Sequence, residues 1–238
     1  MKKQSLFLFA LCCLTVGCKS PDVAKTGEPS DQTPSPTATS DPAASTAVAI
    51  PDEVRTEGFA YYGVDQKQPL NMELVKDGVT TNKGAIEFKL LEVKDGKLTF
   101  EQSYTGDLAA NFGTSKLFAD KTGVYGTELL GATLGEPQLE MPATASPGVS
   151  WKMPKPIKTA SFTILEMSNK IVGRESITVP LGKFESLKMV SSAKLSQSGT
   201  ISTATMTAWL VKDIGMVKLV IKTVSGGKSV EQTLRATK

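Results

Sequence analysis

The sequence predicts an all-β domain that is built as an antiparallel barrel, half-barrel or sandwich. Apolar and polar residues alternate with period two in segment after segment, and most of these segments end in a turn signal. No long segment has the 3.6-residue period of a helix. Many short strands with short connections favour an antiparallel sheet that closes or doubles on itself, because a flat open sheet exposes its edges.

The clearest pair of strands surrounds Asp95-Gly96. Apolar residues alternate with polar ones from Ile86 to Leu90 and again from Leu98 to Tyr104. Asp-Gly between two alternating runs is the strongest short signal for a hairpin. The remaining strands are predicted, in chain order, at residues 70–75, 116–119, 124–130, 149–153, 157–167, 171–179, 184–195, 201–211, 216–224 and 228–236.

Glycine-containing turns separate many of these strands. Ser198-Gly199, Gly226-Gly227 and Lys121-Thr122-Gly123 supply backbone freedom that residues with a Cβ resist. Residues 107–112 are expected to form one helical turn. The order of the strands within the sheet does not follow from the sequence.

The composition excludes several classes of function. Lys and Arg total 27 against 24 Asp and Glu, so the chain lacks the basic excess with which nucleic-acid binders neutralise phosphates. It has no histidine, the most frequent general base and metal ligand near neutral pH. Its cysteines are Cys12, Cys13 and Cys18, so the later chain has neither an internal disulfide nor a thiolate zinc site. We therefore expect no cofactor, no metal and no serine or cysteine triad.

Residues 1–17 have the pattern of an export signal. Lys2 and Lys3 give a positive start, an apolar run follows from Leu6 to Val16, and Gly17 precedes Cys18. The run is too short to cross a hydrocarbon core as a helix, which takes on the order of 20 residues. Leu-Thr-Val-Gly followed by Cys18 resembles the lipobox of bacterial lipoproteins, although a threonine stands where that family usually has leucine.

The lipobox resemblance implies a lipid anchor. In that family the cysteine thiol receives a diacylglyceryl group, the leader is removed, and the new amino terminus is commonly acylated, with palmitate as the usual label. Carried over, Cys18 is the lipid-attachment residue, the membrane is a partner, and the protein resides in the bacterial cell envelope. Lys19 in place of aspartate points to the outer membrane, facing the periplasm or the surface. The alternative is a plain secretory leader with an incidental cysteine.

Residues 18–52 are predicted to be a disordered linker between the leader and a single antiparallel β domain over residues 53–238. The linker is rich in Pro, Ser, Thr and Ala and has no aromatic residue, so it cannot bury enough apolar surface to offset its ordering entropy. A tether of about 30 residues spans roughly 30 Å and would let the domain float free of the bilayer.

Two spaced motifs mark the block of residues 177–222. The first is Val-Pro-x-Gly-x-Phe at residues 179–184, and the second is Trp…Gly-x-Val-Lys from Trp209 to Lys218. The block resembles a widespread group of bacterial envelope domains of unknown function. Asp213 stands where that family often has glycine, and aspartate tolerates left-handed backbone geometry better than most residues.

Trp209 is the candidate ligand-binding residue. The alternation puts it in register with Val211 on one strand face, which favours a position in the core with the indole N–H bonded at the rim. The alternative is a Trp209 that stacks on a ligand.

Three function hypotheses remain open. The first is a non-catalytic binding or envelope-assembly module for an apolar or peptide ligand, and not an enzyme. The second is a carboxylate-dependent hydrolase of cell-envelope glycans, which needs two carboxylates about 5–10 Å apart in a cleft. The third is a structural surface protein that recruits a protein partner. A hollow apolar interior would favour a carrier of apolar ligands. The acidic residues are scattered, and examples are Asp95, Glu101, Glu140, Glu166 and Glu175.

Overall fold

The computed structural model describes residues 48–129, 132–158 and 162–238. These residues form short helices and one antiparallel sheet. In chain order the elements are η2 (Asp52–Val54), α1 (Glu57–Tyr62), β1 (Leu70–Lys76), β2 (Val79–Lys94), β3 (Lys97–Tyr104), α2 (Leu108–Phe112), β4 (Thr114–Asp120), β5 (Gly123–Leu129), β6 (Ala132–Pro142), β7 (Ser150–Lys152), β8 (Ile157–Lys158), β9 (Thr163–Val179), β10 (Gly182–Gln197), β11 (Thr200–Val211), β12 (Gly215–Ser225) and β13 (Lys228–Ala236).

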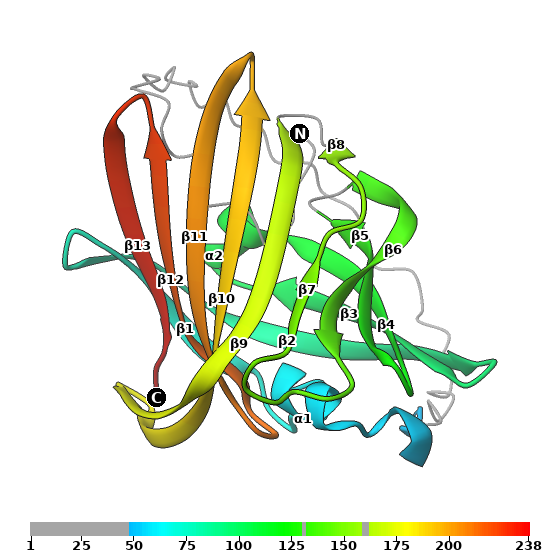
Figure 1. Ribbon diagram of the computed structural model, residues 1–238. Coiled ribbons are helices and arrows are strands. Elements are labelled where there is room, and N and C mark those ends of the chain that lie inside the picture. The colour runs from blue at the N-terminus through cyan, green and yellow to red at the C-terminus, as the bar shows by residue number, and fades with distance from the viewer. Residues whose placement is uncertain (1–47, 130–131, 159–161) are drawn as a thin grey trace, which may run out of the picture.

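The sheet curls into a nearly closed barrel (Figure 1). Its strands follow the order β6-β5-β4-β3-β2-β1-β13-β12-β11-β10-β9-β7, and β8 also pairs with β9. In Figure 1, β9 to β13 stand upright in front of β2 to β5, which run across behind them. The predicted all-β class is therefore confirmed, and the core lies between these two groups of strands.

Side chains fill the space between the two groups of strands. Leu98 and Phe100 on β3 and Leu195 and Leu234 on the upright strands are fully buried. All four belong to one hydrophobic cluster that takes in both groups. Burial of this apolar surface is the main force that holds the two groups together.

Several turns have the backbone geometry that the sequence predicts. The φ angle is 51° at Asp95 and 70° at Gly96, and it is 47° at Ser198 and 80° at Gly199. Positive φ at both central residues is the geometry that two-residue hairpins favour, because it matches the twist of the strands. Asp213 also has a positive φ, of 64°, so it adopts the left-handed geometry expected of it.

Other elements differ from the prediction. The strands predicted at residues 157–167 and 171–179 are instead the short β8 and the single long β9. Residues 168–170 contain no turn, and they pair with β10 between register shifts that allow a long strand to bend. β6 and α1 are not among the predicted elements, because prolines and glycine interrupt β6 and α1 is too short to show a period. The predicted helical turn is confirmed as α2.

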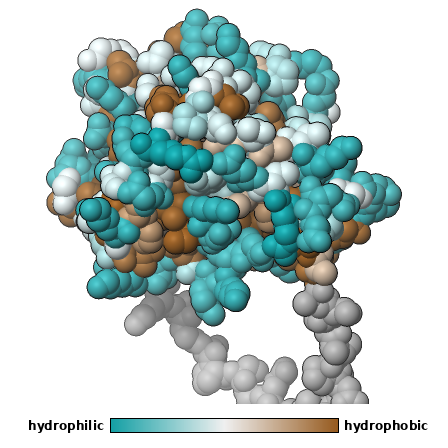
Figure 2. Space-filling model, turned by 60° about the horizontal axis from the view of Figure 1, so that its bottom comes forward, coloured by the Kyte–Doolittle hydropathy of each residue, from teal (hydrophilic) through white to brown (hydrophobic). Residues whose placement is uncertain are grey.

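α1 packs against the lower end of the barrel in Figure 1. The hydroxyl of Thr56 caps the helix by accepting a hydrogen bond from the Phe59 N–H at 3.2 Å. Gly58 lies directly against the carbonyl group of Pro142, where an added Cβ would come within 1.9 Å of the oxygen. A glycine at this position is therefore required for the helix to approach the end of β6. Figure 2 shows this end of the molecule, where hydrophobic side chains are exposed in patches between hydrophilic ones.

Candidate functional site

The predicted lipid-attachment residue, Cys18, lies outside the described residues, as does most of the predicted linker. The anchor therefore stays a prediction. In the part of the chain that the structure describes, no helix is long and apolar enough to cross a membrane. The same part contains no group of three acidic, histidine or cysteine side chains placed to hold a metal ion.

Trp209 lies on the outer face of β11. Ala208 and Leu210 on either side of it are buried in the core, whereas Trp209 is half-buried. Its cross-strand neighbours are Lys188 on β10 and Lys218 on β12. The expectation that Trp209 fills the core is wrong, because positions 208 and 210 of the strand face inward and position 209 faces outward.

Charged side chains surround the indole ring of Trp209. The indole N–H donates a hydrogen bond to Oε1 of Glu175 at 2.5 Å. The ammonium groups of Lys188 and Lys218 lie 5.4 Å and 4.9 Å from the ring centroid. The hydrogen bond from Trp209, followed by the one from Lys188, lowers the pKa of Glu175. Two cations beside the ring favour an anionic ligand over a cationic one.

Trp209 belongs to a row of cross-strand partners that continues across the sheet. Lys218 pairs with Arg235 on β13, and Arg235 pairs with Glu73 on β1. Nη2 of Arg235 lies 2.6 Å from Oε1 of Glu73. Burial raises the pKa of Glu73, but the hydrogen bonds from Arg235 and Thr80 outweigh burial, so the pKa is lowered overall. The row therefore carries more fixed positive than negative charge.

The two ends of the sheet, β6 and β7, face each other across a seam. Trp151 on β7 spans it, because its indole N–H donates a hydrogen bond to the carbonyl oxygen of Leu139 on β6 at 2.9 Å. Lys155 forms an ion pair with Glu136 of β6. A pocket of about 330 Å³ lies beside this ion pair, and we call it the seam pocket. Its lining residues are Thr133, Leu134, Gly135, Glu136, Gln138, Lys155, Pro156, Ile157 and Lys158.

Gln138 is the buried polar side chain of the seam pocket. The residue is 8% exposed, and its Nε2 donates to the carbonyl oxygen of Glu136 at 3.2 Å. Its Oε1 has no hydrogen-bond partner within the part of the chain that the structure describes. An unpaired buried acceptor is unfavourable by about 1–3 kcal/mol. Gln138 therefore has a buried acceptor beside the seam pocket that is unpaired among the described residues.

Glu140 lies at a β-bulge of β6. Val124 pairs with Met141 and Tyr125 pairs with Leu139, so Glu140 is the extra residue between them. Its carboxyl faces Gly126, where an added Cβ would come within 3.2 Å of Oε1. Burial raises the pKa of Glu140 to about 7. The pKa of this carboxyl therefore lies well above that of an ordinary glutamate.

The scattered carboxylates named above lie on several elements of the sheet. Asp95 is in the turn after β2, Glu101 is on β3 and Glu140 is on β6. Glu166 and Glu175 share β9, but at about 3.3 Å per residue they are roughly 30 Å apart. These two carboxylates cannot form the pair that a glycan hydrolase needs.

Sequence reasoning identifies Trp209 as a candidate and misses the seam. Trp151 lies in a predicted strand, but its partner Leu139 is on β6, which the alternation does not reveal. Pro154 and Pro156 are the available signal, since two prolines so close together interrupt strand pairing and mark an irregular sheet edge.

Comparisons with known proteins found one family model that matches part of the chain and two solved structures of similar fold that cover about three quarters of it. Residues 137–219 match a family model described as DUF3108-like, and this range includes both motifs of the envelope-domain resemblance. No curated protein matches the chain. A solved structure from Bacteroides fragilis, described as an exported protein with a YmcC-like fold, has a TM-score of 0.48 and 11% identity, over 74% of this chain and 98% of that one. A second, described as a lipoprotein from Parabacteroides distasonis, has a TM-score of 0.46 and 11% identity, over 75% of this chain and 97% of that one.

Proposed function

We propose that the chain is a lipoprotein, anchored in the bacterial cell envelope through Cys18, whose β domain binds an extended peptide of a protein partner at the seam. The module is non-catalytic. The leader pattern of residues 1–17 supports the anchor, as does the linker of residues 18–52, which gives the domain reach above a membrane.

The open seam is the observation that carries the binding function. β6 and β7 are the two ends of the strand order, so each has one edge that no other strand of the described residues pairs with. Extended peptides add to such edges through main-chain hydrogen bonds. Gln138, which lines the seam pocket, has a buried acceptor that is unpaired among the described residues and that a peptide N–H group could bond after a small rotation of the side chain. The strand edges and this acceptor together fit a peptide.

The ion pair that spans the seam can open for a ligand. The side chains of Lys155 and Glu136 are 66% and 56% exposed. Exposed ion pairs contribute about 0–1 kcal/mol, so a peptide that replaces this contact loses little.

The packed interior argues against a carrier that encloses an apolar ligand. A pocket inside the barrel, lined by residues such as Tyr62, Phe88 and Gln102, has a volume of about 20 Å³. That volume has room for about one water molecule. The ligand of this domain therefore binds at its surface, where the seam pocket is more than ten times larger.

Site-specific photo-crosslinking in cells tests the proposed function. Thr133 is exposed at the seam, and Val79 is exposed at the start of β2. A photoreactive residue at position 133 is expected to give one discrete adduct whose partner is the same in repeated mass-spectrometric identifications. The same residue at position 79 is the matched control and is expected to give none. Equal adducts from both positions, or none from position 133, would contradict binding at the seam.

A further inference from the structure

Charge is divided between the two halves of the sheet. Residues 48–142, which contain β1 to β6, hold 9 Lys and Arg against 15 Asp and Glu, a net charge of 9 − 15 = −6. Residues 143–238, which contain β7 to β13, hold 14 against 5, a net charge of 14 − 5 = +9. The strand order keeps β1 to β6 together on one side of β13, so the division in sequence is also a division in space.

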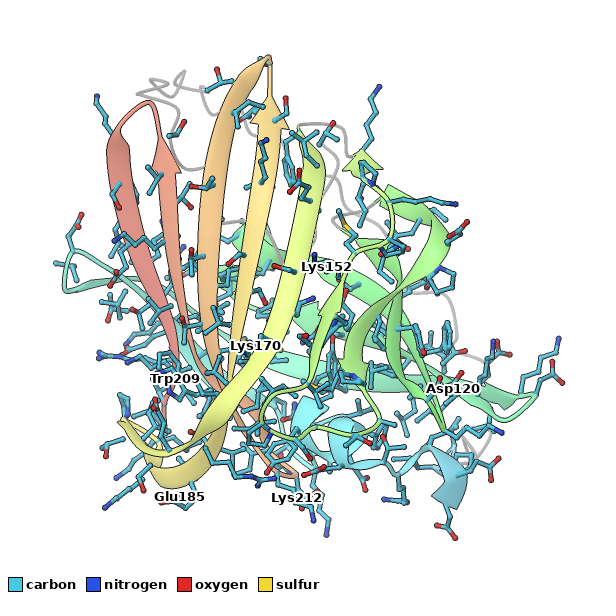
Figure 3. All side chains as sticks on the ribbon, in the orientation of Figure 1. Asp120, Lys152, Lys170, Glu185, Trp209 and Lys212 are labelled. Carbon is cyan, nitrogen blue, oxygen red and sulfur yellow. The ribbon has the colours of Figure 1, made fainter. Side chains whose placement is uncertain are left out.

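The positive charge gathers on the outer face of β7 to β12. Strand alternation and register place Lys152, Lys170, Lys188, Lys194, Lys218 and Lys222 on this face, which we call the basic face. Figure 3 marks two of these lysines, at positions 152 and 170, together with Trp209. The acidic residues of the same strands and of β13 are fewer, and those nearest the lysines are Glu166, Glu175 and Glu231.

A cleft of about 690 Å³ opens on the basic face beside β7. Lys152, Lys155 and Lys194 line it together with one carboxylate, that of Glu166, and Lys155 is also paired with the exposed Glu136 at its edge. The hydroxyl groups of four further lining residues face outward with these lysines, and they belong to Ser168, Ser192, Thr203 and Thr205. Ammonium and hydroxyl donors around one cleft match the oxygens of a phosphate group.

We propose that the basic face docks onto an anionic phospholipid surface, with a headgroup phosphate in the cleft. The proposal rests on the proposed function, because the Cys18 anchor brings the domain within a linker length of a bilayer. Because the basic face spans several strands, its area matches a lipid surface better than a single small ligand. Trp209 at this face has an apolar ring and a polar N–H, the combination that is enriched where a protein meets a membrane surface.

Vesicle co-sedimentation tests the basic face separately from the anchor. The chain from Lys19 onward keeps every described residue and lacks Cys18, so a wrong lipidation prediction cannot affect the result. Binding is expected to vesicles of phosphatidylcholine mixed with phosphatidylglycerol and not to phosphatidylcholine alone. Added salt should weaken it, because salt screens exposed charges. Equal binding to both vesicles would overturn the proposal.

A matched pair of variants locates the contact. Lys152→Glu with Lys170→Glu reverses two exposed charges on the basic face, and it should weaken binding at least about tenfold. Lys94→Glu with Lys121→Glu reverses two exposed charges in the acidic half, gives the same net charge, and should leave binding unchanged. Circular dichroism confirms that both variants are folded. Equal losses in both variants would overturn the proposal, as would tighter binding to soluble polyglutamate than to the anionic vesicles.

Discussion

Glu140→Gln tests the buried carboxyl at the bulge of β6. The pKa of Glu140 is raised by burial to about 7, from an ordinary value of 4.5. Ionising this carboxyl is therefore less favourable by up to about 3 kcal/mol in the folded chain than in the unfolded chain. Glutamine keeps the shape of the side chain and removes its charge, so the variant isolates this contribution.

The sign of the pH dependence follows from the direction of the pKa shift. Between 4.5 and about 7 the unfolded chain has released the Glu140 proton and the folded chain still holds it. Unfolding therefore releases a proton, and the free energy of unfolding falls as the pH rises through this window. Glu73 and Glu175 have lowered pKa values and titrate below the window.

Urea unfolding followed by circular dichroism measures this effect. Between about pH 4.5 and about pH 8, the free energy of unfolding of the wild-type chain should fall by up to about 3 kcal/mol more than that of Glu140→Gln. Glu92→Gln, at an exposed position of β2, removes one carboxylate without burial and should keep the wild-type pH dependence. If wild type and Glu140→Gln showed the same pH dependence, the reasoning about the buried carboxyl would be wrong.

Three further predictions concern the anchor and the backbone. Cys18→Ser should abolish incorporation of labelled palmitate and leave an unprocessed or soluble protein, and unchanged labelling would remove the lipoprotein assignment. Gly58→Ala should destabilise the fold by at least about 2 kcal/mol in thermal or urea unfolding, because its Cβ would lie 1.9 Å from the oxygen of Pro142. Gly135→Ala is the control, since a Cβ there meets nothing within 4 Å, and a similar loss in both would refute the packing argument. Asp213→Gly should stabilise the protein by up to about 1 kcal/mol, because φ is 64° there, and a clear loss of stability would show another role for the carboxylate.

Elements whose structure is decided by local chemistry are predictable from this sequence. Asp95-Gly96 and Ser198-Gly199 make two-residue turns, in which glycine takes positive φ readily and the flanking alternation sets the strands on either side. β9 is less predictable. Its length depends on its pairing with β10, which includes register shifts. The residues of β9 alone do not reveal this pairing.

The candidate site is predictable only in part, since it depends on long-range pairing. Trp209 stands out in the sequence, but the face on which it lies depends on the inward positions of its neighbours. The seam exists because β6 and β7 are the two ends of the strand order, and nothing local to Trp151 or Gln138 reveals that order. The predicted anchor at Cys18 rests instead on a leader pattern that is local in the sequence, and it stays a prediction.

Crosslinking from both sides of the seam tests the central claim most directly. Thr133 lies on β6 and Lys158 lies on β8, on opposite sides of the seam pocket. If one extended peptide occupies the seam, photoreactive residues at these two positions should attach to the same short segment of the same partner. Adducts that map to different partners, or to distant segments of one partner, would contradict a peptide strand in the seam.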